Sequence, residues 1–303
     1  MEKMTSPYRI EFCLKILITL LNCLCLAKQP PSRPIADLGS GSASQISCFV
    51  LSNDLGVKCI GQNLNGQLGQ LSTRIVGDEG YFEMGDCLRT CALGANARPK
   101  QVVMGAVFTC ALLDDGTVKC FGSCQTGTCG TGQTSGNIGD SPNTSPANVN
   151  AIRFNSSVVQ LTAGESHVCA LLQNGQVHCW GSGSEGQLGT GSIIDILPSP
   201  LTSSIDFGFN RSAREISAGY THTCAVLNSI SNANQTDLVC FGNCLFGKCG
   251  SGSSANIVER GENLVPIKLG TDINGSSRWA LHVSAGAAHT CVSRGNTVLL
   301  HMH

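Results

Sequence analysis

The chain has 303 residues, of which 42% are hydrophobic, 5% aromatic and 13% charged, and it contains 36 glycines. Glycine is costly inside helices and useful in tight turns, so this composition argues against a helix bundle and favours a turn-rich β protein. The 19 basic and 20 acidic residues give a formal net charge of −1, with no run of Lys or Arg that would track a phosphate backbone. We therefore expect no nucleic-acid binding.

Residues 1–27 are expected to form a signal peptide. The basic residues Lys3, Arg9 and Lys15 precede an apolar stretch from Ile16 to Ala27. An apolar core of this length fits a signal peptide and is short for a membrane span. The alternatives are a buried first strand and an uncleaved anchor. We expect a secreted or cell-surface protein without stable membrane insertion, whose mature part covers residues 28–303.

The cysteine content also favours export. The sequence has 18 cysteines, of which Cys13, Cys23 and Cys25 lie in the expected signal peptide, so that 15 remain in the mature chain. This number is too high for an ordinary cytosolic protein without metals, because disulfides persist in oxidising compartments. Since 15 is odd, one cysteine should have no partner in the chain.

The mature chain is repetitive. Four stretches align with one another, and a fifth starts at Cys291 and stops before its second half. Their first cysteines are 62, 59, 55 and 67 residues apart. Such a period predicts an array of similar structural units. The four aligned stretches are residues 48–69, 110–130, 169–189 and 224–250.

Each unit is expected to form an antiparallel hairpin, because two apolar runs flank a turn signal. In the second unit, Asp114-Asp115-Gly116 suits a three-residue loop, which sets Cys110 opposite Cys120. Directly opposed residues have the Cα separation that a disulfide needs. The same counting in the other units, with longer loops in the first and fourth, predicts four cross-strand disulfides: Cys48–Cys59, Cys110–Cys120, Cys169–Cys179 and Cys224–Cys240.

A second set of cysteines lies in the glycine-rich segment that follows each hairpin. The positions of Asn63 and Leu68 in the first unit both hold cysteine in the second and fourth units. Joint replacement in two repeats indicates that the two side chains are spatial neighbours. We therefore expect disulfides rather than a shared metal site, since thiols in an oxidising compartment pair first. The expected pairs are Cys124–Cys129 and Cys244–Cys249.

Three cysteines remain. Cys87 and Cys91 are close enough in sequence to bridge through a tight loop, so we expect a disulfide between them, although nothing in the sequence sets its geometry. Cys291 has no expected partner, because Leu300 occupies the position that matches Cys120.

The repeats resemble those of the regulator of chromosome condensation family, in which an apolar hairpin precedes a W-G-x-N-x-x-G-Q-L-G segment. CWGSGSEGQLGTG at Cys179 is the best match, GQNLNGQLG at Gly61 is next, and the pattern covers residues 35–300. The resemblance implies an all-β protein, a β-propeller of tandem four-stranded blades that usually number about seven. The doubled cysteines and VGDEGYFEMGD at Val76 are similar to a secreted, disulfide-bearing branch of that family.

The number of repeats departs from the family pattern. About four and a half repeats are too few for a seven-bladed ring. Either the chain is a truncated product of a longer gene, or it forms an open arc or a smaller ring. We expect truncation, because an incomplete hairpin leaves unpaired strand edges.

No catalytic, cofactor or metal site is expected. The sequence contains no nucleophile elbow, zinc-protease motif or phosphate loop. His167, His222 and His289 each stand two residues before a hairpin cysteine, and His-x-Cys on one strand face could suit a metal. Because those cysteines generally have closer disulfide partners, and Phe108 replaces the histidine in one unit, we interpret the histidines as structural.

Loops between the blades are expected to present a binding face to an unknown protein or ligand. Guanine-nucleotide exchange on a small GTPase, which the founding member of the family performs, is the alternative function, but it belongs inside the cell. The sequons lie between the hairpin motifs, which agrees with a glycosylated exterior. They are centred on Asn143, Asn155, Asn210, Asn234 and Asn274.

Overall fold

The computed structural model describes residues 35–302, apart from 40, 42–43, 53–55, 79–86, 194–195, 198, 200–202, 230–234, 272–278 and 295–296. The expected signal peptide at residues 1–27 lies outside the described residues, as do two of the five sequon asparagines, Asn234 and Asn274.

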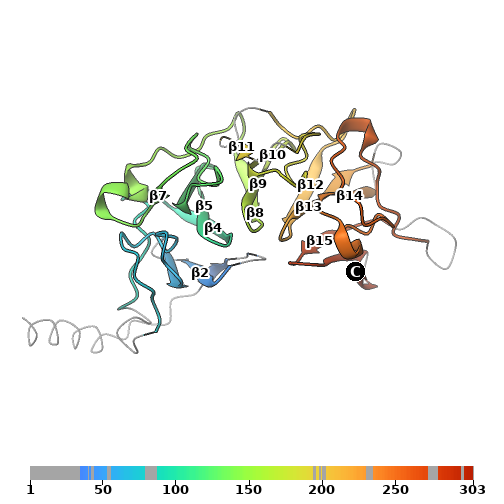
Figure 1. Cartoon of the computed structure of the whole chain (residues 1–303). Coiled ribbons are helices and arrows are strands. Elements are labelled where there is room, and N and C mark those ends of the chain that lie inside the picture. The colour runs from blue at the N-terminus through green and yellow to red at the C-terminus, as the bar shows by residue number, and fades with distance from the viewer. Residues whose placement is uncertain are drawn as a thin grey trace, which may run out of the picture.

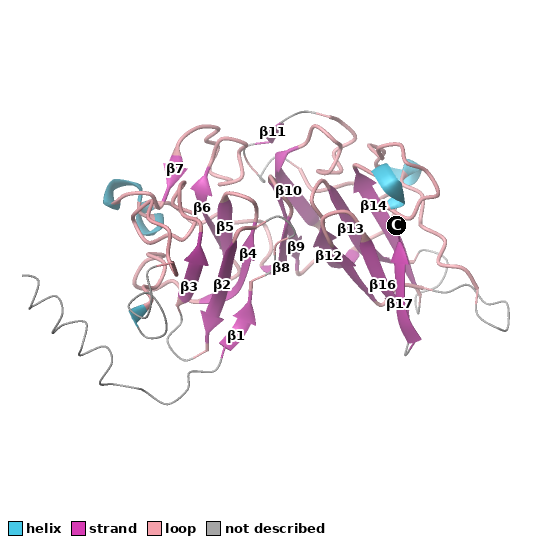
Figure 2. Cartoon of the chain, turned by 60° about the horizontal axis from the view of Figure 1, so that its bottom comes forward, coloured by secondary structure: helices cyan, strands magenta, loops and turns pink. Residues whose placement is uncertain are grey.

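Five antiparallel sheets follow one another along an arc whose two ends do not join (Figure 1). We call them blades 1 to 5 in chain order; Figure 2 shows the same strands from a second direction. Short 3₁₀ helices lie in the connections: η3 (Pro142–Thr144), η4 (Pro146–Asn148), η5 (Leu245–Gly247) and η6 (Gly261–Asn263). The strands are β1 (Ile35–Leu38), β2 (Ile46–Leu51) and β3 (Val57–Gly61) in blade 1; β4 (Pro99–Met104), β5 (Phe108–Leu113), β6 (Val118–Ser123) and β7 (Asn137–Ile138) in blade 2; β8 (Val158–Ala163), β9 (His167–Leu172), β10 (Val177–Ser182) and β11 (Ile196–Leu197) in blade 3; β12 (Ala213–Ala218), β13 (His222–Asn228) and β14 (Thr236–Gly242) in blade 4; and β15 (His282–Ala285), β16 (Thr290–Arg294) and β17 (Thr297–Met302) in blade 5.

The central hairpin of each of the first four blades has the register expected from the sequence. In blade 2, Leu112 pairs with Val118 and Cys110 with Cys120. Gly116 closes the turn with a φ of 78°, a conformation that residues with a Cβ rarely adopt. The cysteines are likewise opposed in the hairpins of blades 1, 3 and 4.

The hydrophobic core lies between the blades. Both faces of the middle strands are buried, as in β5 and β9, where every residue is buried. The buried residues described form four clusters, one between each pair of successive blades. A blade therefore depends on its neighbours for its stability, as expected for a repeat protein.

The fifth repeat is more complete than the sequence indicated. Its second hairpin strand, β17, is present and pairs with β16. A register shift between Val292 and Arg294 moves the pairing by one residue, so His301, and not Leu300, faces Cys291. Among the described residues, blades 2 and 3 have four strands and the other blades have three. An isolated bridge between Gly242 and Ile257 takes the place of the outer strand in blade 4.

Candidate functional site

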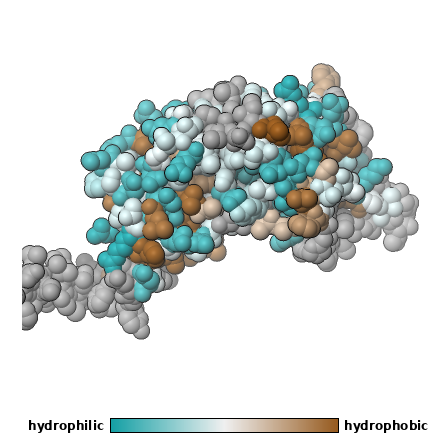
Figure 3. Space-filling model, viewed as in Figure 1, coloured by the Kyte–Doolittle hydropathy of each residue, from teal (hydrophilic) through white to brown (hydrophobic). Residues whose placement is uncertain are grey.

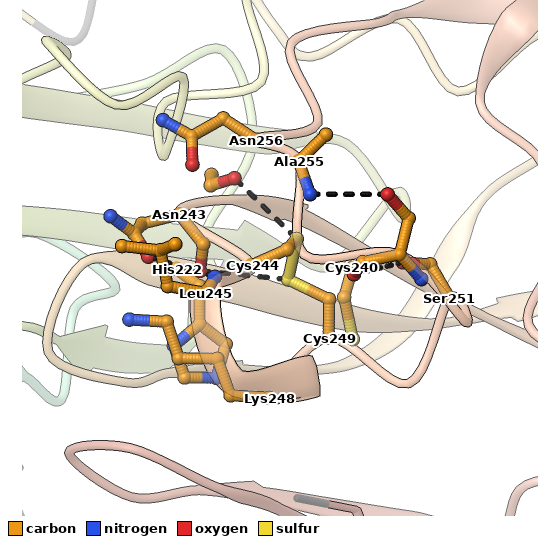
Figure 4. Close-up of a disulfide and its surroundings, with 12 residues drawn as sticks. His222, Cys240, Asn243, Cys244, Leu245, Lys248, Cys249, Ser251, Ala255 and Asn256 are labelled. Carbon is orange, nitrogen blue, oxygen red and sulfur yellow. Dashed lines mark hydrogen bonds between the residues drawn. A yellow bond between two sulfur atoms is a disulfide. The ribbon is translucent and has the colours of Figure 1, made fainter.

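Six disulfides join the cysteines that the repeat logic paired. Four of them link the two middle strands of blades 1 to 4, and two close short loops in the glycine-rich segments. Figure 4 shows the second kind, the disulfide between Cys244 and Cys249, with Leu245 and Lys248 beside it. These bridges hold the hairpins of blades 1 to 4 and the glycine-rich loops of blades 2 and 4 in one conformation. The pairs are Cys48–Cys59, Cys110–Cys120, Cys124–Cys129, Cys169–Cys179, Cys224–Cys240 and Cys244–Cys249.

The expected Cys87–Cys91 disulfide is wrong. Cys91 is a buried free thiol. The backbone N–H of Cys91 donates to the carbonyl of Val57 at 2.8 Å, which turns its side chain toward β3. There its sulfur lies 3.7 Å from that of Cys59. Burial raises the pKa of the Cys91 thiol to about 12.

The arc has two loop ends of different composition. At the hairpin-tip end lie the turns between the middle strands and the segments that lead into the next blade. We call the first strand of each blade its inner strand, because it faces the inside of the arc. At the glycine-rich end lie the glycine-rich segments and the short loops that follow the inner strands. Backbone hydrogen bonds tie the latter together, since Ala106 donates to Glu165 and Glu165 donates to Tyr220, both at 3.0 Å.

Two exposed sequon asparagines lie at the hairpin-tip end. Asn155 is exposed, and its side-chain amide donates to Gln176 Oε1 beside the hairpin turn of blade 3, at 3.4 Å. Asn210 is also exposed and precedes Ser212, which packs against Gly175 of the same turn. The third described sequon differs: Asn143 is exposed in η3, shortly after Gly139 and Asp140, which pack against Gly66 of the glycine-rich loop of blade 1.

Apolar side chains project from the glycine-rich end. Leu64, Leu245 and Phe246 occupy the tips of two glycine-rich loops, and Phe246 is 80% exposed. Its φ of 62° is a left-handed conformation that costs a residue with a side chain about 1 kcal/mol or more. On the face shown in Figure 3, apolar residues are interspersed with polar ones.

The histidines before the hairpin cysteines connect blades. Nε2 of His167 lies 2.9 Å from Thr223 Oγ1 in the next blade, and Thr223 donates its hydroxyl hydrogen to the carbonyl of Gln187 at 2.9 Å. A hydroxyl has one hydrogen, so the imidazole must donate from Nε2. His222 and Thr290 repeat this arrangement in the following pair of blades.

Both imidazoles are neutral at physiological pH. Burial lowers the pKa of His167 to about 3, and the pKa of His222 to about 4. A Cβ on Gly164 would overlap the ring of His167, so the glycine three residues earlier in the sequence is required there. No group of three or more His, Cys, Asp or Glu side chains suited to a metal occurs among the described residues.

Sequence reasoning missed the polar side chains that join the inner strands. Gln101 accepts from the N–H of Leu161 at 2.8 Å and donates to its carbonyl at 3.1 Å. Gln160 makes the same pair of bonds with Ile216, and Glu215 accepts from the N–H of Val283. The signal was available, because Gln101, Gln160 and Glu215 each stand nine residues before a hairpin cysteine. These side chains satisfy strand edges that face the inside of the arc.

The inside of the arc also contains a cavity of about 340 Å³, lined by residues of β4, β8, β12 and β15. Its lining includes the polar side chains Gln101, Gln160, Thr162 and Ser217, each of which forms a hydrogen bond with the next blade. Within the described part of the chain, no helix is long and apolar enough to cross a bilayer.

Comparison with known families identifies the repeat. Profiles of the regulator of chromosome condensation (RCC1) repeat match residues 100–130, 158–187 and 174–226. Among curated proteins, the serine/threonine-protein kinase Nek9 of Xenopus laevis is 34% identical over 97 residues, which is 32% of this chain and 10% of the kinase. The ultraviolet-B receptor UVR8 of Arabidopsis thaliana is 27% identical over 194 residues, which is 64% of this chain and 38% of the receptor.

Solved structures show the same fold. Prp20p from Saccharomyces cerevisiae superimposes with a TM-score of 0.62 at 18% identity, over 89% of this chain and 58% of Prp20p. Yeast RCC1 (Prp20) in a complex with Kap60 gives a TM-score of 0.65 at 17% identity, over 89% of this chain and 56% of the matched one. The chain spans less than two thirds of the length of each of these relatives.

Proposed function

The chain belongs to the regulator of chromosome condensation repeat family, and we propose that it is a secreted β-propeller scaffold that binds a protein partner through its glycine-rich loop end. In this proposal residues 1–27 are a signal peptide, and residues 28–303 are the binding domain. The six disulfides support a route through an oxidising compartment.

One observation carries the choice of binding face: the two loop ends differ. Glycans on Asn155 and Asn210 would cover the hairpin-tip end, including Phe209, which is 79% exposed beside Asn210. The opposite end keeps Leu245 and Phe246 accessible on a loop closed by a disulfide. Rigid, exposed aromatic side chains are typical anchors of protein interfaces, since little conformational entropy is lost when they bind.

The strained backbone of Phe246 supports a binding role. A glycine would adopt a φ of 62° without cost, and glycines fill most left-handed positions described in this chain. A large apolar residue that is both strained and exposed does not stabilise the fold. A side chain with these properties is accounted for if it is buried against a partner.

The test uses full-length secreted chain and measures its binding to the surface of cells from the source organism. Phe246→Gly should reduce the affinity about tenfold or more, as expected for an interface anchor, and should not lower the melting temperature. Phe209→Gly is the matched control, because Phe209 is equally exposed at the other end. An equal loss in both variants would contradict the choice of face.

A second assay addresses the alternative function. Prp20p is described as binding Gsp1p and histones, but at 18% identity the likeness of this chain to Prp20p shows the fold alone. Accelerated GDP release from a small GTPase by the purified chain would favour nucleotide exchange over the scaffold role.

A further inference from the structure

Blade 1 brings three sulfur atoms together. A disulfide joins Cys48 of β2 to Cys59 of β3, and the sulfur of Cys91 lies 3.7 Å from that of Cys59. Cys91 is a free thiol that is 7% exposed, and its S–H donates to the carbonyl of Leu68 at 3.0 Å. At this separation the sulfur of Cys91 is in van der Waals contact with a disulfide that it can attack.

Cys91 occupies a position that holds isoleucine in the other complete blades. In each blade, the N–H of the residue at this position donates to the carbonyl at the start of the third strand. Ile152 and Ile205 are almost fully buried there and pack in the core. Packing alone would therefore be served by isoleucine in blade 1 as well. The matching bonds run from Cys91 to Val57, Ile152 to Val118, Ile205 to Val177 and Ile267 to Leu238, at 2.7 to 2.8 Å.

From this contact we infer that Cys91 and the Cys48–Cys59 disulfide form a thiol–disulfide exchange site. Cys91 loses its proton and its thiolate attacks the sulfur of Cys59. The Cys59–Cys91 bond forms, the Cys48–Cys59 bond breaks, and the electron pair leaves on Cys48, which takes up one proton. The number of disulfides and thiols is unchanged, so the step requires no oxidant or reductant.

The exchange changes which segments of blade 1 are joined. In the first arrangement β2 is tied to β3, and in the second β3 is tied to the outer segment that contains Cys91. Burial raises the pKa of Cys91 to about 12, so the thiolate is scarce and exchange is slow compared with that of an exposed thiol. Cys91 also lines a pocket of about 300 Å³, together with Gly94 and Asn96 among others.

The first test removes the leaving group. The full chain with Cys48→Ser is equilibrated with oxidised glutathione, alkylated and digested without reduction. We expect a peptide that links Cys59 to Cys91. The matched control is Cys110→Ser, which leaves Cys120 in a blade whose outer position is Ile152; its Cys120 should be alkylated or bound to glutathione. Cys59 and Cys91 modified separately in Cys48→Ser would overturn the proposal.

The second test uses the unmodified chain, so it does not depend on the folding of a variant. The chain is incubated with a trace of reduced glutathione, and samples are quenched with acid over time and alkylated. Peptides linking Cys59 to Cys91 should appear together with alkylated Cys48, and Cys91→Ile, which copies the other blades, should yield neither. Alkylation confined to Cys91, with Cys48–Cys59 intact at every time point, would overturn it.

Discussion

The contact between blades 2 and 3 and the contact between blades 3 and 4 satisfy the same kind of buried carbonyl by different means. Between blades 3 and 4, the hydroxyl of Thr223 donates to Gln187. Between blades 2 and 3, the position of that threonine holds Val168, which cannot donate. There the indole N–H of Trp180 donates to Thr128, the counterpart of Gln187, at 3.0 Å.

The residue that packs beside this position differs between the two contacts as well. His167 accompanies Thr223, whereas Phe108 accompanies Val168, and both Phe108 and Val168 are fully buried in an apolar cluster. A buried carbonyl without a donor costs about 1 to 3 kcal/mol, so the donor is maintained even where its source differs. The two contacts show that the repeats preserve hydrogen-bond satisfaction rather than residue identity.

Acidification should produce the largest difference in stability between the two contacts. The pKa of His167 is lowered by burial to about 3 and that of His222 to about 4, from an ordinary value of 6.5. Below pH 6.5 the unfolded chain binds more protons than the folded one, so stability falls as the pH falls. The loss is about 2 kcal/mol for each imidazole near pH 5.

Hydrogen exchange at decreasing pH, corrected for intrinsic rates, would locate this loss. Blades 3 to 5 should lose protection first, while the contact of Phe108 with Val168 retains it. Uniform loss of protection along the arc would contradict the assignment to the histidines.

Converting the contact between blades 3 and 4 into the apolar kind should destabilise the chain unless an indole donor is added at the same time. His167→Phe with Thr223→Val leaves the carbonyl of Gln187 without its donor, so the free energy of unfolding should fall by about 2 to 3 kcal/mol in urea titrations. Phe241 occupies the position of Trp180, and adding Phe241→Trp should restore most of the loss. If the double variant is as stable as the parent chain, the carbonyl does not need a donor.

The reverse change concerns blade 3. Trp180→Phe keeps an aromatic ring but removes the N–H that reaches Thr128, and it should cost about 2 kcal/mol by thermal or chemical unfolding. Val168→Thr in the same chain introduces a hydroxyl at the position of Thr223 and should recover part of the loss. A Val168→Thr change without Trp180→Phe serves as the control, and it should not stabilise the chain.

The smallest effect is expected on the inside of the arc. Gln101 and Gln160 each bond to both the N–H and the carbonyl of the next inner strand, whereas Glu215 can only accept. Glu215→Gln should therefore add one hydrogen bond to Val283 and raise the free energy of unfolding by about 0.5 kcal/mol. The measurement is a slightly higher melting temperature. A decrease would show that the pairing of Glu215 with His282 matters more.

The local features of this protein could be read from its sequence. The opposition of Cys110 and Cys120 follows from a three-residue turn and the alternation of a strand, and the pairing of Cys124 with Cys129 follows from joint replacement in two repeats. Both depend on residues a few positions apart, whose geometry the local backbone sets.

Contacts between segments far apart in the chain could not be read in this way. Cys91 lies next to Cys59, 32 residues away, because a backbone bond to Val57 brings the outer segment against β3. The bond from Trp180 to Thr128 spans 52 residues and exists only because successive blades pack face to face. Sequence spacing carries no information about which side chains meet across such a contact, because packing between blades and the demand for hydrogen-bond partners decide it together.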